Sequence, residues 1–311
     1  MTVQSDTLLV NRPGWKAWLK KRWEPFAAVP MLGWLFGALI AVGLEILIGT
    51  PLARLLGLSK VPVLFGFTIV LKEPLLIPSV ILYVLLIYIL PIGLITRLTT
   101  RLANRLAARL LDVSMVASVF VHLALLYATL HLWSSISDYR VLMVRLTLVA
   151  VMLTLSLNVV NGYMGEFSCS HPGFMALGAY AASVFTIVLF VQDNRFGAPL
   201  LPPALGPFAF PLILILSGAI SAAGALLVAI PSFRTRGDYL AIISLAFMFI
   251  VKSLFENLEV VGGARGLGGQ PHWASLPIVF IWTILCIWTI NNFVRSTLGK
   301  ALNAVRDGEL A

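Results

Sequence analysis

Residues 158–180, NVVNGYMGEFSCSHPGFMALGAY, interrupt two long apolar runs with polar side chains, glycines and a proline. An apolar run of about 20 residues is long enough to cross a bilayer as a helix, so this stretch is expected at membrane depth. Backbone that leaves the helix there must be satisfied by protein or by water in a cavity. Because transporters place pathways at such breaks, we interpret 158–180 as a candidate translocation site. The alternative is an ordinary short loop between two spans, with glycines for a tight turn.

The composition around this stretch indicates a membrane protein. Of 311 residues, 59% are hydrophobic and only 11% are charged, with a mean hydropathy of +0.97. Soluble domains usually carry about 25% charged residues. The predicted fold class is an all-α integral membrane protein, a polytopic helical bundle. Cys169 and Cys286 form no disulfide framework, the four histidines show no metal-ligand spacing, and no P-loop is present, so we expect no metal and no cofactor.

Apolar stretches of suitable length predict about eight transmembrane helices. They are 31–49, 75–95, 113–133, 141–160, 173–191, 209–230, 239–255 and 276–294. Lysines and arginines are concentrated in the segments that are cytoplasmic if both the N-terminus and the C-terminus lie inside, so this orientation is predicted. The net charge of +9 is accordingly attributed to the cytoplasmic loops, and no nucleic-acid partner is expected. The segment 61–74 is apolar but too short, and is expected to be re-entrant or a lip on the outer face.

Two basic segments are predicted to lie at the cytoplasmic membrane surface. Within residues 1–30, Trp15, Trp18 and Trp23 alternate with cationic side chains, which is typical of an interfacial anchor. Residues 94–112 place leucines and arginines at four-residue spacing, which predicts a basic amphipathic helix on the membrane. Both segments lie in the N-terminal region, of which 31–140 is expected to be a variable set of spans.

Three charges fall inside the predicted spans: Glu45, Arg145 and Lys252. All three lie near predicted outer ends, so we expect their side chains to snorkel to the interface. The alternative is that one of them lines an outer vestibule. The glycine-rich residues 256–275 are predicted to form a flexible outer loop that meets a partner or a solute.

Three stretches together carry a resemblance to a known family: 161–180, 234–241 with the sequence RTRGDYLA, and 299–307 with the sequence GKALNAVRD. They resemble the second inner-membrane permease subunit of the branched-chain amino acid ABC importers. The resemblance covers roughly 145–311. Family members usually have glycine before the histidine, whereas Ser170 and Pro172 flank His171 here. Pro172 suits the first turn of a helix, so a helix is expected from there on.

The resemblance implies a non-enzymatic transport subunit in the bacterial inner membrane, with ATP hydrolysis on partners. It implies a second homologous permease, two cytoplasmic ATPases and a periplasmic solute-binding protein, all around the lipid bilayer. The expected solute is a branched-chain or hydrophobic amino acid, or a related small solute such as urea or an amide. The pathway residues that we expect are Asn158, Asn161, Gly162, Gly165, Ser168, His171 and Gly178. The residues expected in the ATPase coupling loop are Gly299, Lys300, Ala301, Ala304, Arg306, Asp307 and Glu309.

The predicted organisation follows from these segments. Residues 141–311 form the permease domain and end within the coupling loop, so we expect the reading frame to continue into further spans. The alternative function is an autonomous secondary carrier or channel. That alternative requires buried ionisable residues near span centres, and the sequence shows none convincingly central. A membrane enzyme would require clustered His, Asp or Glu at one membrane depth, which is not found.

Overall fold

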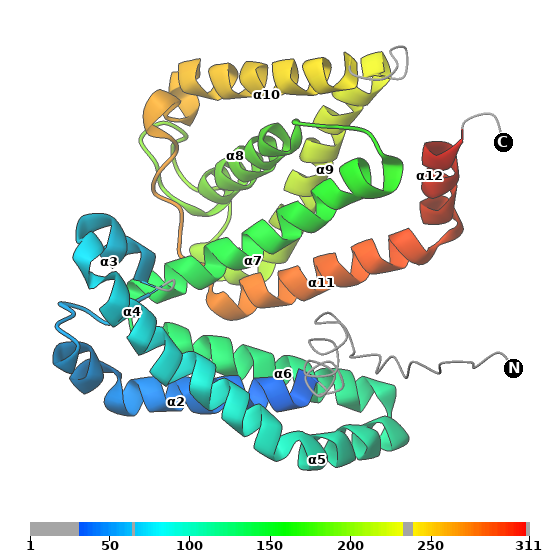
Figure 1. Cartoon of the computed structure of the whole chain (residues 1–311). Coiled ribbons are helices and arrows are strands. Elements are labelled where there is room, and N and C mark those ends of the chain that lie inside the picture. Colours follow the sequence, from blue (N-terminus) through cyan, green and yellow to red (C-terminus); the bar gives the residue numbers. More distant parts are fainter. Residues whose placement is uncertain (1–30, 64–65, 233–238, 309–311) are drawn as a thin grey trace, which may run out of the picture. The chain divides into compact units, whose positions relative to one another are not determined.

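The computed structural model describes residues 31–63, 66–232 and 239–308, and it consists of helices joined by short connections (Figure 1). Eight helical stretches are long and apolar enough to cross a membrane, as the sequence predicted. No strand occurs among the described residues. The predicted anchor within 1–30 and most of 234–241 lie outside them. The chain divides into two units, 1–144 and 145–311, which are described separately.

The first unit contains α2 and the helices up to the start of α7. Its elements are α2 (Met31–Leu55), α3 (Phe67–Lys72), η2 (Pro74–Leu76), α4 (Ile77–Val84), η3 (Leu85–Ile89), α5 (Leu90–Val113), α6 (Met115–Ser134) and the first turns of α7 (Asp138–Asn158). The described residues of the segment 61–74 contribute the short helix α3 and the first residue of η2, and no ninth span, which agrees with the predicted shortness of this segment.

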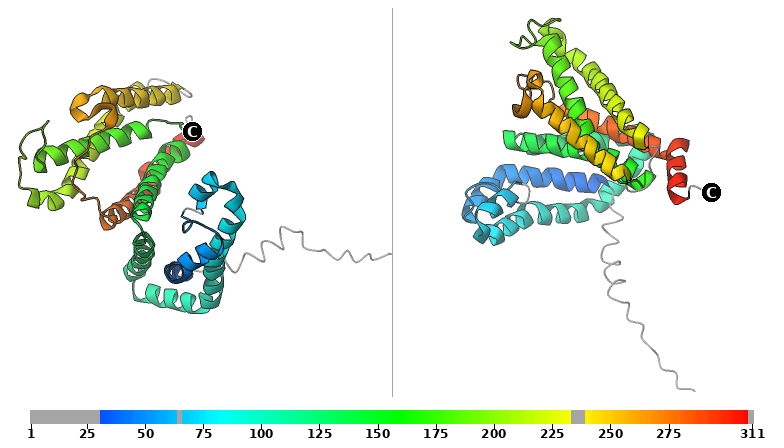
Figure 2. Two further views of the ribbon diagram at one scale, coloured as in Figure 1. Left: turned by 90° about the vertical axis from the view of Figure 1, so that its left-hand side faces the viewer. Right: turned by 90° about the horizontal axis from the view of Figure 1, so that it is seen from above.

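The helices α2 and α5 lie side by side (Figure 2), and small residues allow their close approach. A Cβ atom at Gly37 would meet Thr96 Oγ1 at 3.0 Å. Thr96 Oγ1 in turn donates to the Gly33 carbonyl at 3.4 Å. Such small-residue contacts and interhelical hydrogen bonds hold helices together where lipid removes the hydrophobic driving force.

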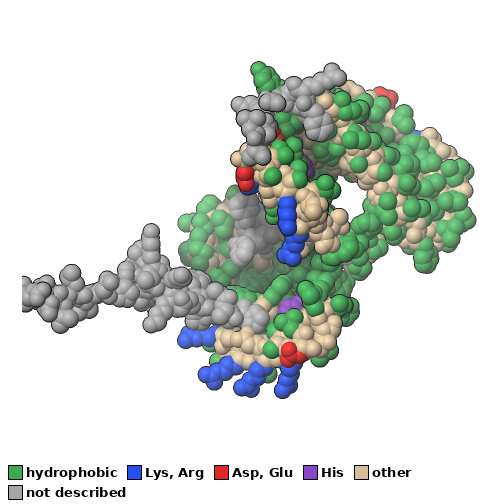
Figure 3. All heavy atoms as spheres, turned by 90° about the vertical axis from the view of Figure 1, so that its right-hand side faces the viewer, with side chains coloured by type: hydrophobic (Ala, Val, Ile, Leu, Met, Phe, Trp, Pro, Cys, Tyr) green, Lys and Arg blue, Asp and Glu red, His purple; other side chains and the backbone are tan. Residues whose placement is uncertain are grey.

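The predicted amphipathic helix 94–112 is helical, but it is not a separate helix. It forms the C-terminal part of α5, which continues from η3, a π-helical turn just before Pro91. Pro91 has no N–H to donate, which accounts for the irregular turn before it. The arginines of α5 are exposed and Thr96 and Ala103 are buried. Figure 3 shows basic side chains gathered along one edge of a mostly hydrophobic surface. That residues 94–112 lie on the membrane surface stays a prediction.

The expectation that Glu45 snorkels to the interface is wrong. Glu45 is 4% exposed and Arg140 is 1% exposed. The Arg140 guanidinium donates to both carboxylate oxygens of Glu45 at 2.8 Å. The Tyr88 hydroxyl also donates to Glu45, the Trp133 indole donates to Tyr88, and the guanidinium lies 4.7 Å from the Trp133 ring centroid. The reason for the error is that the partner of Glu45 lies 95 residues away, between the predicted spans 113–133 and 141–160.

The second unit carries the helix break. Its elements after α7 are η4 (Val159–Met164), α8 (His171–Phe190), η5 (Pro203–Leu205), α9 (Gly206–Ser232), α10 (Tyr239–Asn257), η6 (Glu259–Val261), η7 (Gly263–Arg265), α11 (Leu276–Arg295) and α12 (Thr297–Asp307). As expected, α8 begins at His171 with Pro172 in its first turn.

The helix α8 packs against both α9 and α10. A Cβ atom at Gly178 would lie 3.7 Å from Ser221 Cβ, and the Ser221 hydroxyl donates to the Phe174 carbonyl at 2.8 Å. On the α10 side, a Cβ atom at Gly173 would meet the Phe247 ring at 3.0 Å. Glycines on two faces of α8 therefore set how closely its neighbours approach.

Candidate functional site

The backbone leaves the α-helix at the predicted break. After Asn158 the chain widens into the π-helical turn η4, which ends at Gly165 with φ of 78°. The Gly165 N–H still donates to the Val160 carbonyl, and residues 165–170 then lie outside any helix until α8 begins at His171. A left-handed backbone at Gly165 favours glycine, because a Cβ atom there is sterically disfavoured. A non-helical connection of six residues therefore separates the two apolar helices.

Side chains of the break and of α10 satisfy the backbone of this connection. Asn161 Oδ1 accepts from the Ser168 N–H at 3.1 Å. Ser244 Oγ, on α10, accepts from the Cys169 N–H at 2.9 Å, and the Ser168 and Ser170 hydroxyls are 2.9 Å apart. Buried backbone polar groups require partners of this kind. Asn161 and Ser168 are thus brought together, and Ser244 is a contributor that the sequence pattern did not single out.

The other predicted pathway residues have different surroundings. The Asn158 side chain covers Gly162, so a side chain at 162 would overlap it. The His171 ring packs edge-on to Phe174, with centroids 6.0 Å apart, and its Nδ1 is buried without a well-formed hydrogen bond among the described residues. Gly178 faces α9 and does not adjoin the break. The structure therefore gathers part of the predicted set around η4 and separates Gly178 from it.

The predicted coupling segment forms the helix α12, which packs against η4. The Ser296 hydroxyl caps its N-terminus by accepting from the Gly299 N–H at 3.3 Å. Gly299 is buried, and a Cβ atom there would clash with the carbonyls of the preceding turn. The tight corner between α11 and α12 thus depends on this glycine.

Arg306 joins α12 to the helix break. Its Nη1 donates to the Gly162 carbonyl at 2.9 Å, and its Cγ lies 2.5 Å from where a Gly165 Cβ would be. Its Nε donates to Asp307 at 2.8 Å, and this guanidinium holds the pKa of the Asp307 carboxyl below its usual value. Lys300, Ala301 and Ala304 are exposed on α12, and Glu309 lies outside the described residues. The two segments chosen separately from the sequence therefore meet at Arg306.

A cavity of about 440 Å³ extends along α8 from Pro172, beside the break, to Tyr180. Its other walls are α10 and the glycine-rich loop at 263–266. The Tyr180 and Phe255 rings stack at one end, with centroids 3.9 Å apart. Concave sites of about 300–1,000 Å³ with mostly apolar walls and few polar groups are typical of small-molecule binding.

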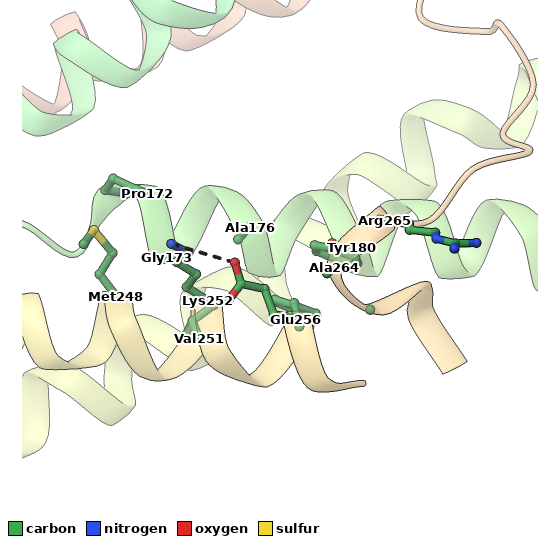
Figure 4. A pocket seen from close by; sticks show the side chains of 13 residues that line it. Pro172, Gly173, Ala176, Tyr180, Met248, Val251, Lys252, Glu256, Ala264 and Arg265 are labelled. Carbon is green, nitrogen blue, oxygen red and sulfur yellow. Dashed lines mark ion pairs between the residues drawn. The ribbon is translucent and has the colours of Figure 1, made fainter. Parts of the chain in front are cut away.

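Three charged residues line the cavity: Lys252, Glu256 and Arg265. Lys252 Nζ and Glu256 Oε1 on α10 are 3.8 Å apart, and Figure 4 shows both side chains reaching toward α8. The Arg265 guanidinium points away from this pair. Lys252 lines a cavity at the end of its span, so the alternative that it lines an outer vestibule stays open. Arg145 is partly exposed. Whether either side chain snorkels stays a prediction.

Comparisons with known proteins agree with the predicted family. Two curated relatives are high-affinity branched-chain amino acid transport system permease proteins LivM, from Salmonella typhimurium and Escherichia coli. Each is 28% identical over 201 residues, which covers 53% of this chain and 43% of the relative. No solved structure matches. Residues 139–311 match the family model described as branched-chain amino acid transport system / permease component. Since this match covers more than half of the chain, the protein belongs to that permease family.

Proposed function

We propose that this chain is the transmembrane permease subunit of an ATP-binding-cassette importer in the bacterial inner membrane. Its solute is a branched-chain or other hydrophobic amino acid, with urea or amides as related small candidates. Separate ATPase subunits supply the energy, a second homologous permease completes the pathway, and a periplasmic binding protein delivers the solute. Both chain ends of the described bundle lie on the cytoplasmic side in this proposal.

The observation that carries the proposal is the contact between α12 and η4. In a permease driven by partner ATPases, movement of a cytoplasmic segment must reach the solute pathway. Arg306 binds the Gly162 carbonyl, and the Gly165 backbone lies against the Arg306 side chain. A displacement of α12 therefore moves or releases backbone at the break. The family match across the same residues supports this interpretation.

The alternative is an autonomous carrier or channel, and one finding favours it. The buried carboxylate of Glu45 in α2 is an intramembrane ionisable group, which is a hallmark of ion-coupled carriers. Both of its oxygens, however, already accept from Arg140, and one also accepts from Tyr88. Because no oxygen is left without a protein donor, we rank the carrier below the ATP-driven permease.

The two functions are separated by reconstitution of the complete gene product in proteoliposomes. With the second permease, the ATPases and the binding protein, we expect leucine uptake that requires ATP. Complexes whose ATPases carry an inactivating substitution are the matched control and should show no uptake. Uptake by this subunit alone, driven by an ion gradient and indifferent to ATP, would overturn the proposal in favour of the carrier.

A further inference from the structure

We propose that the cavity between α8, α10 and the glycine-rich loop binds the zwitterionic head group of an amino acid. Glu256 takes the ammonium group, Lys252 takes the carboxylate, and the apolar wall takes the side chain. This inference rests on the proposed function for the class of solute. It goes beyond that function by assigning a binding site and the two residues that bind the charged groups of the solute.

The cavity lies next to the helix break. The cavity begins at Pro172, the second residue of α8 and the neighbour of His171 at the break. It ends at Tyr180, eight residues further along the same helix, which corresponds to about 12 Å at helical rise. The end of the candidate stretch 158–180 and the predicted solute-meeting loop therefore border the same cavity, although the named pathway residues themselves do not line it.

The walls of the cavity are mostly apolar. Met248, Val251 and Phe255 give α10 an apolar surface, and Ala176 on α8 lines the same cavity. The loop at 263–266 is glycine-rich, and Gly263 and Gly266 have positive φ values. It lines the cavity with backbone, with Ala264 and with Arg265, whose guanidinium points away from the charge pair. An aliphatic side chain fits such walls, whereas a charged one would be desolvated without a partner.

The charge pair in the cavity is exposed and loosely held. The Lys252 and Glu256 side chains are 63% and 51% exposed, and their closest N–O distance is 3.8 Å. An exposed pair of this kind is weak, so little free energy is lost when each group exchanges its partner for a ligand. An amino acid carries its ammonium and carboxylate on one carbon atom. It can therefore pair with both groups at once, in the opposite order.

The competing explanation is that the pair is only an i,i+4 contact on a helix surface. Direct binding separates the two. The probe is radiolabelled leucine bound to the nucleotide-free permease–ATPase complex in lipid nanodiscs, without the binding protein. The competitors are the keto acid of leucine, which lacks the ammonium, and its decarboxylated amine, which lacks the carboxylate.

We expect wild-type complex to prefer leucine over both competitors. Glu256→Gln should weaken leucine binding about fivefold, as expected for a partly exposed charge contact. Glu256→Gln should also reduce the preference for leucine over the keto acid, and should leave the preference for leucine over the amine unchanged. Lys252→Gln should reduce the preference for leucine over the amine and leave the preference over the keto acid unchanged. Glu259→Gln, an exposed neighbour outside the cavity lining, is the matched control and should bind as wild type.

The outcomes separate this inference from the proposed function. If the complex imports leucine with ATP but both variants keep wild-type binding and wild-type competitor preference, the assigned site is wrong and the permease function stands. If the complete system imports no amino acid, the proposed function itself fails. Equal weakening of all three compounds by both variants would also overturn the inference, because it would indicate a structural effect in place of charge recognition.

Discussion

Each unit contains an acid–base pair, between α2 and α7 in the first and within α10 in the second, but the pairs have opposite surroundings. Glu45 and Arg140 are both 2% exposed at their side chains and 2.8 Å apart, whereas Lys252 and Glu256 are 63% and 51% exposed and 3.8 Å apart. Each pair borders a cavity, of about 300 Å³ and 440 Å³ respectively. Only the second pair keeps its charges accessible. Enclosure, more than the presence of charge, thus separates a structural pair from a candidate binding pair.

The enclosed pair is held by groups from four helical elements. Glu45 comes from α2, Tyr88 from η3, Trp133 from α6 and Arg140 from α7. Desolvation of two ions is costly, and it is offset only when geometry is good and the remaining lone pairs and protons are satisfied. The bidentate contact and the Tyr88 donor meet that condition. We infer that this network positions the start of α7 against α2.

The largest expected effect follows from breaking the enclosed pair. Glu45→Gln and Arg140→Gln each leave one buried charge without its partner, which costs about 3–5 kcal/mol. We expect either variant to lower the melting temperature of the detergent-solubilised protein and the yield of monodisperse material on size-exclusion chromatography. The measurement is a fluorescence-detected thermal unfolding curve for each variant.

The double variant, with both residues changed to Gln, serves as the control. It removes both charges and leaves amides that can bond to each other, so it should recover a large part of the lost stability. Losses that simply add would show that the two residues are not coupled. Single variants that unfold like the wild type would show that the charges lie in contact with water, as in the exposed pair.

The next effect concerns Arg306, whose surroundings are intermediate between those of the enclosed and the exposed pair. Its guanidinium is exposed, yet it donates to a backbone carbonyl of the helix break. Gly165→Leu should block ATP-driven uptake while leaving membrane insertion intact. The left-handed backbone at 165 costs a side-chain-bearing residue about 1–3 kcal/mol, and the new Cβ would displace Arg306. Uptake and membrane-fraction yield are measured together.

Two glycines of the same unit provide matched controls. Gly197 has a φ of 85° with nothing near its missing Cβ, and Gly218 lies in an open helical position. Gly197→Leu therefore tests the effect of backbone strain without a clash, and Gly218→Leu tests the effect of a larger side chain without backbone strain. If either control blocks uptake as strongly as Gly165→Leu, displacement of Arg306 is not the cause. Normal uptake by Gly165→Leu would indicate that the break is a plain loop.

A smaller effect is expected from Tyr88→Phe. The change removes the donor to Glu45 and leaves the Trp133 N–H without its acceptor, for a loss of about 1.5 kcal/mol. The Glu45–Arg140 contact itself remains, so the unfolding curve should shift less than for Glu45→Gln. Tyr139→Phe, at an exposed position of α7, is the control and should not shift it. A Tyr88→Phe shift as large as that of Glu45→Gln would make the phenol essential to the pair.

The spans could be predicted because their signal is local. Each of the eight apolar stretches reports its own length and hydropathy, and Pro172 marks the first turn of α8 where the structure has it. The basic segment 94–112 was correctly predicted as helical. Its continuity with the preceding span was missed, because a π-helical turn lets α5 continue past Pro91.

The partners of charges could not be predicted, because they are set by tertiary contacts. Arg140 follows a polar stretch, SSISD, and looks like a loop residue, whereas it is buried against Glu45. Ser244 sits in an apolar run without any motif, yet it supports the backbone at Cys169. A one-dimensional pattern also could not show that Arg306 lies on Gly162, since 144 residues separate them.

The smallest expected effect is on the exposed pair. Glu256→Gln or Lys252→Gln should change unfolding stability by no more than about 0.5 kcal/mol, since solvent already screens these charges. The melting temperature without ligand should stay near the wild-type value, and the stabilisation by added leucine should fall. Glu259→Gln should change neither quantity. If either variant lost as much ligand-free stability as Glu45→Gln, Lys252 and Glu256 would be a structural pair. The proposal that they bind the charged groups of an amino acid would then be wrong. Unchanged stability with impaired ligand stabilisation would instead mean that this protein uses enclosure to hold helices together and accessibility to bind.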